Sequence, residues 1–441
     1  MLYYTIERLN SMLLRFSVEN FRSFKERQTL FLSAVKTCKE WRDENTAEDA
    51  GQRILRSAVI YGANASGKTN LFLAMERMRI FMLVSVDIDK NPNKLFAEPF
   101  LLSMESVTKP ETFELQFTYG GKVFTYGFSL LLTGKGIDQY EVSGEWLIEN
   151  VKKKDVPYFL RERRIDADGR VANVISVDKK KMPQGVGLEG RTRPDSLFFT
   201  VAAQFAEPVC QSLMEYIRSS LNVVSGLNHQ GMNIYSRNQL VTNPVAGLSM
   251  KKLIHDADTG IKDVAIAPDG QLISVHNRYN ESAKAIGDFV FNFHVAESQG
   301  TLKIFDLSGV LIDTLNNGRV LVVDELDAKL HPVLVRRLVM LFNNPETNPK
   351  NAQLIVNVQS PDLLAFKVFY EPRKRAIARL RRDQLYFVEK NNTESSCLTS
   401  LIEFKNENGG STRNDSSFAK DYMLGHYGGI PYVRELVKPE V

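Results

Sequence analysis

The sequence predicts an α/β fold in which a mixed sheet flanked by helices is joined to an antiparallel β-rich part. Three observations carry this prediction. An apolar strand pattern at 58–60 runs into a glycine-rich loop and then into a helical pattern. A second apolar strand pattern, at 320–323, ends in two acidic residues. Two alternating runs, 113–119 and 122–128, are separated by Gly-Gly, which predicts a β-hairpin.

Composition bounds the class of protein. A chain of 441 residues is long enough for two or three structural units, and 43% hydrophobic with 24% charged residues is typical of soluble globular proteins. The net charge of +4 does not by itself favour nucleic acid. The three cysteines lie far apart without a C-x-x-C spacing, so neither a disulfide framework nor a zinc site is predicted. With no long apolar run and no leader, we expect a cytoplasmic protein without membrane association.

Four segments are expected along the chain. Residues 1–11 look unlike the strand pattern that begins at Met12, and we interpret them as a non-native or upstream-start extension. Residues 12–200 are expected to form an N-terminal half that includes the antiparallel region, and 291–441 a C-terminal half. Between them, 201–290 is interpreted as a partly helical insertion, too short for a long coiled coil and without sustained heptads.

The loop after 58–60 matches the pattern G-x-x-x-x-G-K-[ST]. Its defining residues are Gly62, Gly67, Lys68 and Thr69, and Asn64, Ser66 and Asn70 lie within or beside it. Glycines let backbone N–H groups turn inward as an anion-binding nest at a helix N-terminus. Lys68 can then reach the β/γ-phosphates, and the Thr69 hydroxyl can bind Mg²⁺. A chance glycine-rich turn is the alternative, and the strand–loop–helix context argues against it.

The acidic pair at the end of 320–323 is Asp324-Glu325, the arrangement of a Walker B strand. Asp324 would hold Mg²⁺, directly or through water, and Glu325 would orient and deprotonate the attacking water. Alone, such a pair is often an ordinary strand exit. Together with the phosphate loop and the following Leu326 to Pro332 segment, it favours a nucleotide site.

A Ser-x-Gly turn precedes a helical pattern about two dozen residues before Asp324. The Ser298 hydroxyl and the Gly300 amide can both donate to a terminal phosphate, and the helix dipole helps. A plain helix cap is the simpler reading of this turn alone. Its position before the Walker B strand favours a phosphate contact.

In this order these motifs resemble an ABC-class ATPase head of the SMC and RecF kind. The closer resemblance is to stand-alone ABC-type ATPases of prokaryotic phage-defence and abortive-infection operons, which include the AbiL and RloA proteins and AriA of the PARIS system. These are akin to the ATPase half of OLD nucleases. The resemblance covers residues 12–435 and implies an ABC-type P-loop NTPase head that binds ATP and Mg²⁺. Besides the motifs above, it rests on the segments 16–24, 383–389 and 421–431.

The resemblance also implies individual roles. It makes Glu297 to Thr301 the signature loop, Leu330-His331 the D-loop, and Arg22-Ser23 the region near the bound nucleotide. Gln359 stands where the family usually places His; Gln can hydrogen-bond a γ-phosphate but cannot carry positive charge, which implies binding with slow hydrolysis. Gln204 is a candidate for the Q-loop, with a core-lining helix residue as the alternative.

The resemblance implies an assembly, because the signature loop of one subunit completes the phosphate site of another. We therefore expect a head-to-tail dimer or a larger homo-oligomer. The resemblance implies a sensor of phage infection that responds to a phage-encoded trigger. The recognisable catalytic residues all serve ATP, so we expect the toxic output to lie on another polypeptide. This effector, a nuclease or toxin, would be separately encoded. A RecF/SMC-like DNA-repair ATPase is the alternative, and the basic segment 372–382 leaves nucleic acid open, with a solvated helix face equally favoured.

Overall fold

The computed structural model describes residues 11–87, 96–134, 136, 139–151, 154–165, 171–224, 229–257, 260–364, 380–404 and 418–430. The extension expected at residues 1–11 lies outside these ranges, except for Ser11. Among the helices that the structure describes, none has the length and apolar character needed to cross a membrane.

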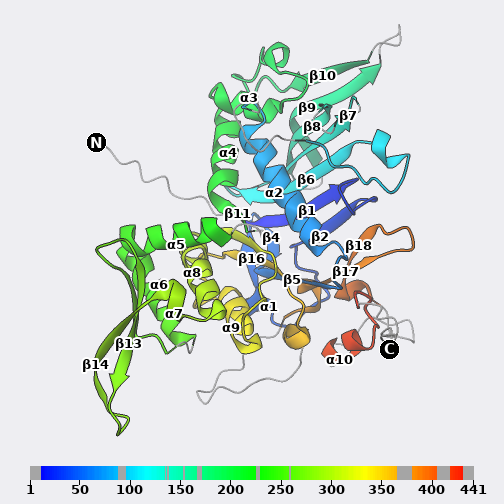
Figure 1. The fold of residues 1–441 in the computed structure, drawn as a ribbon. Helices are drawn as coiled ribbons and strands as arrows, with labels where there is room; N and C mark the ends of the chain where they lie inside the picture. The colour runs from blue at the N-terminus through cyan, green and yellow to red at the C-terminus, as the bar shows by residue number, and fades with distance from the viewer. Residues whose placement is uncertain are drawn as a thin grey trace.

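A six-stranded sheet forms the centre of the fold (Figure 1). Its strands lie in the order β11 (Leu221–Val224), β15 (Val320–Val323), β16 (Gln353–Asn357), β5 (Ser57–Gly62), β17 (Leu385–Lys390) and β18 (Ser396–Ser400). The first five are parallel, and β18 is antiparallel to β17. The apolar strands predicted at 58–60 and 320–323 are confirmed. Because β5 lies between β16 and β17, the beginning and the end of the chain share one sheet.

A second, seven-stranded sheet is antiparallel throughout. Its order is β10 (Val171–Val177), β9 (Lys154–Ile165), β8 (Tyr140–Val151), β7 (Lys122–Leu132), β6 (Glu111–Tyr119), β1 (Leu13–Glu19) and β2 (Gln28–Phe31). The turn between β6 and β7 is Gly120-Gly121, with φ values of 58° and 73°. A two-residue hairpin turn of this hand needs positive φ at both positions, which glycine allows. The predicted hairpin is therefore confirmed.

The helix after the phosphate loop, α2 (Lys68–Val84), is packed between the two sheets. Its apolar side chains share one core with Ala58 and Ile60 of β5 and with aromatic residues of β6 and β7, whereas Val59 and Tyr61 belong to the core on the other side of the central sheet. This alternation follows from the two-residue period of a strand. Helices α3 (Phe198–Gln204) and α4 (Pro208–Ser220) pack beside α2. The first turn of α2 is thus fixed from both sides.

Helices cover the opposite face of the central sheet. Those against the sheet are α8 (Gln299–Asn317), α9 (Pro332–Asn343) and α10 (Phe418–Met423), and α5 (His229–Thr242) and α6 (Pro244–Asp256) pack on α8. Their apolar residues form the second core with Val59, Leu321, Val323 and Val356. The shorter elements α1 (Arg42–Asn45), β3 (Thr46–Asp49) and β4 (Gln52–Leu55) precede β5. The phosphate loop therefore joins a helix on one face of the sheet to a strand at its centre.

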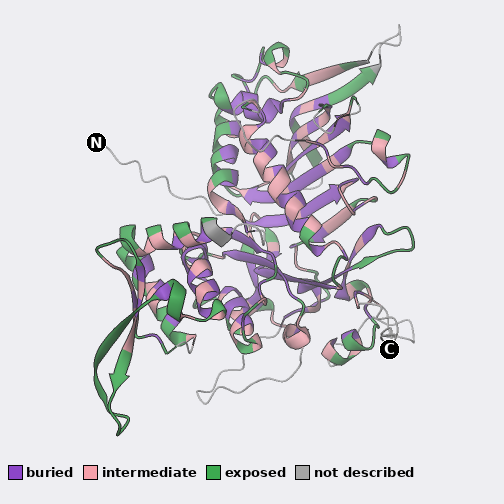
Figure 2. Ribbon diagram, viewed as in Figure 1, coloured by how far each residue is buried: buried purple, intermediate pink, exposed green. Residues whose placement is uncertain are grey.

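A three-stranded sheet ends in a hairpin that stands away from the rest of the molecule (Figure 1). It consists of β12 (Asp263–Ile266), β13 (Leu272–Tyr279) and β14 (Ala285–Asn292), and α7 (Phe293–Ala296) follows directly. Figure 2 shows the outer part of the hairpin as exposed. This sheet was not predicted from the sequence.

The insertion expected at 201–290 begins later than 201. Helix α4 contributes to the core beside α2, and β11 is the edge strand of the central sheet. Residues 208–224 therefore belong to the central fold, because the amphipathic helix leads into a strand that pairs with β15. The part that stands outside both large sheets runs from α5 to β14.

Candidate functional site

The phosphate loop has the geometry of an anion-binding turn. Gly62 ends β5, and Gly67, with a φ of 113°, immediately precedes the first helical residue, Lys68. A Cβ built on Gly67 would overlap with the side chain of Ser396, so this position requires glycine. Lys68 Nζ donates to the carbonyl oxygens of Gly62 (2.6 Å) and Ala63 (2.9 Å). Burial lowers the pKa of the Lys68 ammonium group, and an anion beside it would offset this cost.

The loop residues fit a chain of phosphates. Ser66 Oγ is buried and has no hydrogen-bond partner within the described part of the chain. Ala65 (φ 62°) and Gly67 turn the backbone so that successive amides converge. Among the residues that the structure describes, no side chain caps α2, so its first-turn N–H groups are available to bind an anion. Asn64 and Thr69 are exposed at the mouth of the loop.

The C-terminal segment 421–430 packs against the start of the phosphate loop. A Cβ built on Gly429 would lie 3.2 Å from Cα of Gly62, so the two glycines pack backbone against backbone. Tyr422 OH donates to the carbonyl of Gly429 (3.2 Å), and its ring lies 5.5 Å from that of Tyr61. The segment 421–431, which the sequence analysis singled out, thus has a structural role at the phosphate loop. Its last residue, Pro431, lies outside the described residues.

The Walker B aspartate meets the phosphate loop at the carboxyl end of the central sheet. Thr69 Oγ1 donates to Asp324 Oδ1 at 3.3 Å. Asn357, at the end of β16, donates to the same carboxylate oxygen. Because β16 lies between β15 and β5, its end residue reaches both neighbouring strands. A threonine hydroxyl beside an aspartate is a donor set that suits Mg²⁺. Asn357 was not among the site residues predicted from the sequence.

Glu325 is held in an uncommon backbone conformation. Its φ is 52°, in the left-handed region that a non-glycine residue adopts at a cost. Its N–H donates to Asn357 Oδ1 at 2.5 Å, and its carbonyl accepts from Lys303 Nζ at 2.6 Å. These two bonds fix the backbone of Glu325, whose side chain is exposed. The Glu325 carboxylate is therefore attached to a rigid backbone, which suits the role of general base.

The signature turn is built onto the loop that follows Walker B. Ser298 caps α8 by accepting from the N–H of Thr301 at 3.1 Å. A Cβ built on Gly300 would lie 2.8 Å from the carbonyl oxygen of Lys329, so the helix start approaches that loop closely. Lys303, on the same helix, donates to the carbonyls of Glu325 and of Ala328 (2.9 Å). The signature turn and the segment 325–331, here called the D-loop because it contains Leu330-His331, are therefore joined through Lys303, which was not predicted from the sequence.

Ser23 lies against the phosphate loop, as the resemblance implies. It accepts from Asn70 Nδ2 at 2.8 Å, and its carbonyl accepts from the N–H of Ser396 at 2.7 Å. The neighbouring Arg22 forms an ion pair with Glu98 at 2.8 Å. The segment 22–23 is thus fixed beside the first turn of α2, with the Arg22 guanidinium bound to Glu98.

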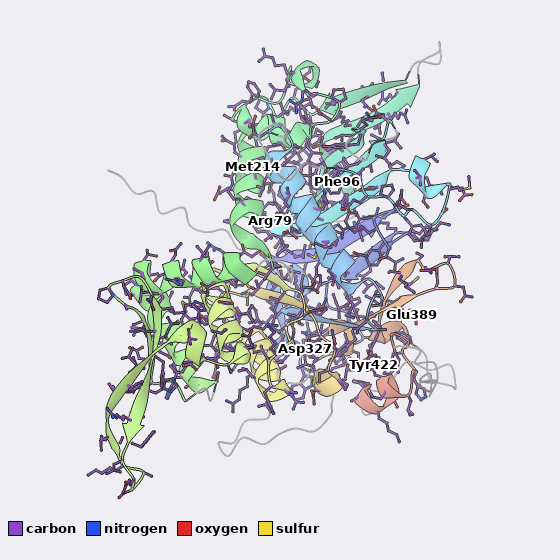
Figure 3. The ribbon with its side chains drawn as sticks, in the orientation of Figure 1. Arg79, Phe96, Met214, Asp327, Glu389 and Tyr422 are labelled. Atoms are coloured by element: carbon purple, nitrogen blue, oxygen red, sulfur yellow. The ribbon has the colours of Figure 1, made fainter. Side chains whose placement is uncertain are left out.

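The residues after β16 are tied to the D-loop by Asp327, which Figure 3 labels. Its carboxylate accepts from the N–H groups of Gln359 (2.7 Å) and Ser360 (2.8 Å). Gln359 is exposed next to Walker B. His331 caps α9 by accepting, through Nδ1, from the N–H of Val333 at 3.3 Å. The structure thus places Gln359, Asp327 and His331 around the same loop.

The Q-loop hypothesis for Gln204 is wrong. Gln204 is the last residue of α3 and is exposed, so it is not a core-lining residue either. Helix α3 is bonded to the far end of α2, where Thr200 donates to the carbonyl of Met82. A helix of 17 residues is about 25 Å long, which separates Gln204 from the phosphate loop.

The basic segment 372–382 is only partly described, because residues 365–379 lie outside the described ranges. Arg381 is buried and paired with Asp383 at 2.7 Å, and Arg382 is paired with Glu40 at 2.9 Å. These two arginines serve the fold and do not lie on a solvated helix face. They are the two of the segment's six basic residues that the structure describes.

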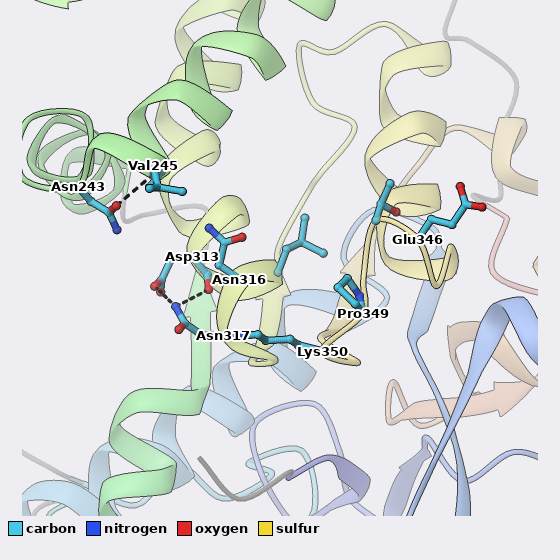
Figure 4. Close-up of a pocket in the computed structure, with 11 residues that line it drawn as sticks. Asn243, Val245, Asp313, Asn316, Asn317, Glu346, Pro349 and Lys350 are labelled. Carbon is cyan, nitrogen blue, oxygen red and sulfur yellow. Dashed lines mark hydrogen bonds between the residues drawn. The ribbon is translucent and has the colours of Figure 1, made fainter. Parts of the chain in front are cut away.

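A polar cavity of about 570 Å³ lies elsewhere (Figure 4). It is lined by the end of α8, including Asp313 and Asn317, and by Pro349 and Lys350 before β16. Strands β15 and β16 begin there, whereas the phosphate loop follows the end of β5. Because these strands are parallel, the cavity lies at the opposite edge of the sheet from the nucleotide site. Among the described residues, no group of three or more His, Cys, Asp or Glu could hold a metal.

The fold and the site define an ABC-type ATPase: a phosphate loop, a Walker B aspartate bonded to it, and a Ser-x-Gly helix cap packed on the D-loop. The particular family follows from a sequence model described as "AAA domain, putative AbiEii toxin, Type IV TA system", which matches residues 57–174 and 215–365, more than half of the chain. The chain belongs to this family. A comparison with curated proteins gave no match.

Solved structures match the chain at low scores. The SMC head domain from Thermotoga maritima has a TM-score of 0.41 and 13% identity, covering 88% of this chain and 98% of that one. An SMC head bound to the C-winged helix domain of ScpA has a TM-score of 0.33 and 13% identity, covering 88% and 97%. The recombination mediator protein RecF with ATP has a TM-score of 0.31 and 11% identity, covering 90% and 100%.

Proposed function

We propose that two copies of this chain close over ATP and that this closure controls a separately encoded effector in phage defence. The observation that carries the proposal is the Asp324 carboxylate, which accepts from both Thr69 and Asn357 while Asn357 also fixes Glu325. This brings the groups needed for ATP and Mg²⁺ together beside the phosphate loop. The family to which the chain belongs is named for a toxin–antitoxin system, which agrees with a defence role.

The residues of one copy have separate roles in ATP binding and hydrolysis. Lys68 and the amides of the phosphate loop bind the β- and γ-phosphates. Thr69 and Asp324 would hold Mg²⁺, which supplies neutralisation of charge on the phosphate oxygens. Glu325 accepts a proton from the attacking water, and Gln359 donates to the γ-phosphate. Asn357 and Lys303 keep Glu325 in place.

A second copy supplies the remaining donors. The Ser298 hydroxyl and the Gly300 amide stand at the start of α8, where the helix dipole favours an anion. In the structure this turn is packed on the D-loop of its own copy. Following the resemblance to ABC-class heads, it binds the terminal phosphate held by the other copy.

Control of the effector follows from a difference in surface between two states. Closure buries the faces around both ATP sites, so a partner that binds one state better is gained or released when ATP binds or is hydrolysed. The phage-encoded trigger would act by shifting the same equilibrium. The protein then acts as the sensor, and the effector carries the toxic activity.

The test is co-expression with the product of the neighbouring gene. We expect that product to co-purify in one nucleotide state, and we expect infection-triggered toxicity that the Lys68→Ala variant lacks. The matched control is Lys122→Ala, an exposed lysine on β7. Phage protection by this chain without a second gene would contradict the proposal. ATP-stimulated, salt-sensitive DNA binding by the chain alone would favour the DNA-repair alternative instead.

A further inference from the structure

The β13–β14 hairpin carries an exposed aromatic face. Phe289 and Phe291 lie on one face of β14, with ring centroids 4.7 Å apart, and they are 44% and 39% exposed. His276, opposite Phe289 in the ladder, meets the Phe291 ring edge-on at 5.4 Å, and the Arg278 guanidinium lies 6.0 Å from the Phe289 ring. All eight residues of β14 are exposed. Contiguous exposed aromatic surface of this kind usually marks an interaction site.

The same face of the hairpin is bonded to the signature loop. Ser274 Oγ donates to Glu297 Oε1 at 2.6 Å, and His276 Nε2 lies 2.8 Å from the same oxygen. Ser274 is opposite Phe291 in the ladder, so both bonds are made from the aromatic face. Glu297 directly precedes Ser298, the cap of α8. A partner bound to the aromatic face would therefore contact the strands that hold Glu297, the residue next to Ser298.

A second apolar patch is fixed to the phosphate-loop side of the molecule. Three large side chains are exposed in it: Leu101 (71%), Leu102 (65%) and Met104 (88%). Asn20 holds both ends of this loop, since its Nδ2 donates to the Ser106 carbonyl at 2.8 Å and its Oδ1 accepts from the Phe100 amide at 3.1 Å. Asn20 lies three residues before Ser23, which contacts α2. The patch thus moves with the phosphate loop.

The two patches lie at opposite ends of the molecule: the hairpin lies beyond the signature turn, and the 101–104 loop, cyan in Figure 1, beyond the phosphate loop. In a two-fold pair the phosphate loop of one copy faces the signature turn of the other. The hairpin beyond the signature turn of one copy then faces the 101–104 loop beyond the phosphate loop of the other copy. We propose, on the basis of the sandwich dimer proposed above, that the aromatic face of the hairpin docks on the 101–104 loop of the second copy.

Charge supports a second copy as the occupant. Arg278 is exposed beside Phe289, and Glu105 is exposed beside Met104, so each apolar patch carries a charge opposite to that of its counterpart. A two-fold axis forms this contact twice in each dimer, once for each ATP site. The hairpin would then report closure to the signature loop through Glu297. The docking contact makes ATP binding and pairing depend on each other.

The test is cross-linking between two differently tagged forms of the full chain. One form carries Phe289→Cys and the other Met104→Cys, both with Cys397→Ser, because Cys397 is partly exposed, and with Glu325→Gln to hold the dimer. With ATP and Mg²⁺ we expect at least ten times more cross-linked heterodimer than without nucleotide. Val290→Cys, on the opposite face of β14, is the matched control and should cross-link at least five times less than Phe289→Cys.

Dimerisation is measured separately by analytical ultracentrifugation. An ATP-dependent dimer without the Phe289–Met104 cross-link would overturn the docking inference and leave the proposed function standing. Absence of an ATP-dependent dimer would overturn both. In a second assay, Arg278→Glu should weaken the dimer about ten-fold and Glu105→Arg on the same chain should restore it; failure to restore it would also count against the contact. Cross-linking of Phe289→Cys to a co-purified effector in place of the second copy would overturn it too.

Discussion

The two sides of the ATP site are held in different ways. The phosphate-loop side is fixed by contacts from segments far apart in the chain, such as Ser396 on Ser66 (2.5 Å) and Gly429 on Gly62. The signature side is held by bonds between residues 21 to 25 apart in sequence, and it continues into a hairpin whose outer strand is exposed. In the proposed dimer, one copy therefore preforms the half that binds nucleotide. The half that would complete the site of the other copy is presented outward, where pairing can regulate it.

The strongest way to separate the two sides is Glu325→Gln. We expect hydrolysis to fall about 100- to 10,000-fold, because the attacking water loses its base, while ATP affinity stays at the parent value. Phosphate release and a nucleotide titration measure the two quantities. The control is Glu394→Gln, an exposed carboxylate on the loop before β18. Hydrolysis at the parent rate would make Glu325 a structural acid at the end of a strand.

Lys68→Ala tests the preformed half itself. The loss of a charged hydrogen bond to phosphate should weaken ATP binding about 100-fold. Lys122→Ala should leave the affinity unchanged, and calorimetric titration with ATP–Mg²⁺ compares the two. An unchanged ATP affinity in Lys68→Ala would show that the ATP site does not lie at this loop.

Asn357→Ala breaks the link between Asp324 and Glu325. We expect turnover to fall about 10- to 100-fold and the free energy of unfolding to fall by about 1–3 kcal/mol, because two buried groups lose their partner. Asn357→Asp keeps an acceptor for the Glu325 amide but places a second carboxylate against Asp324, so it should not restore turnover. Restored turnover in Asn357→Asp would show that the donor to Asp324 is dispensable.

Lys303 joins the signature turn to the loop that follows Walker B, and its charge gives a pH dependence. Burial lowers its pKa to about 8, from 10.5. Between these values the unfolded chain binds more protons than the folded one, so the free energy of unfolding rises with pH. Relative to Lys303→Met, the parent should gain roughly 1–3 kcal/mol between pH 7 and pH 10. Urea unfolding at both pH values measures this difference. If the free energy of unfolding changed by the same amount between pH 7 and pH 10 in both proteins, the prediction would be wrong.

Gln359→His is expected to have the smallest effect. A histidine can carry positive charge beside the γ-phosphate, so turnover should rise about two- to ten-fold, and more at pH 6 than at pH 8. Gln211→His, on the exposed side of α4, is the control. No change would mean that position 359 is silent in this chain.

The phosphate loop could be predicted because its strand, glycines and lysine are contiguous in sequence, and the same holds for Asp324 after its apolar strand. The partners that fix these residues could not. Ser396 and Ser66 are 330 residues apart, and Asn357 and Asp324 are 33 apart, so no local pattern indicates that they meet. Lys303 is buried because it donates to carbonyls of the loop after Walker B, and a helical period in the sequence does not reveal that contact.

The β12–β14 sheet escaped prediction for a different reason. Strand β14 is exposed on both faces, so it lacks the alternation of apolar and polar residues that identifies a half-buried strand. The polar stretch after β11 likewise forms helix α5, whose contacts with α8 outweigh its weak helical pattern. Both elements depend on the fold around them more than on their own sequence.

The place of β5 between β16 and β17 sets an order of assembly during synthesis. Its neighbours in the sheet, residues 353–357 and 385–390, leave the ribosome long after β5 itself. At bacterial or eukaryotic elongation rates this delay is roughly 15–60 s. Strands β1, β2 and β6 to β10 all come from the first 177 residues, and their sheet can cover one side of α2 during the wait. The other side of β5 stays open until the last strands arrive, so the sheet that carries the phosphate loop is completed only when the chain is nearly complete.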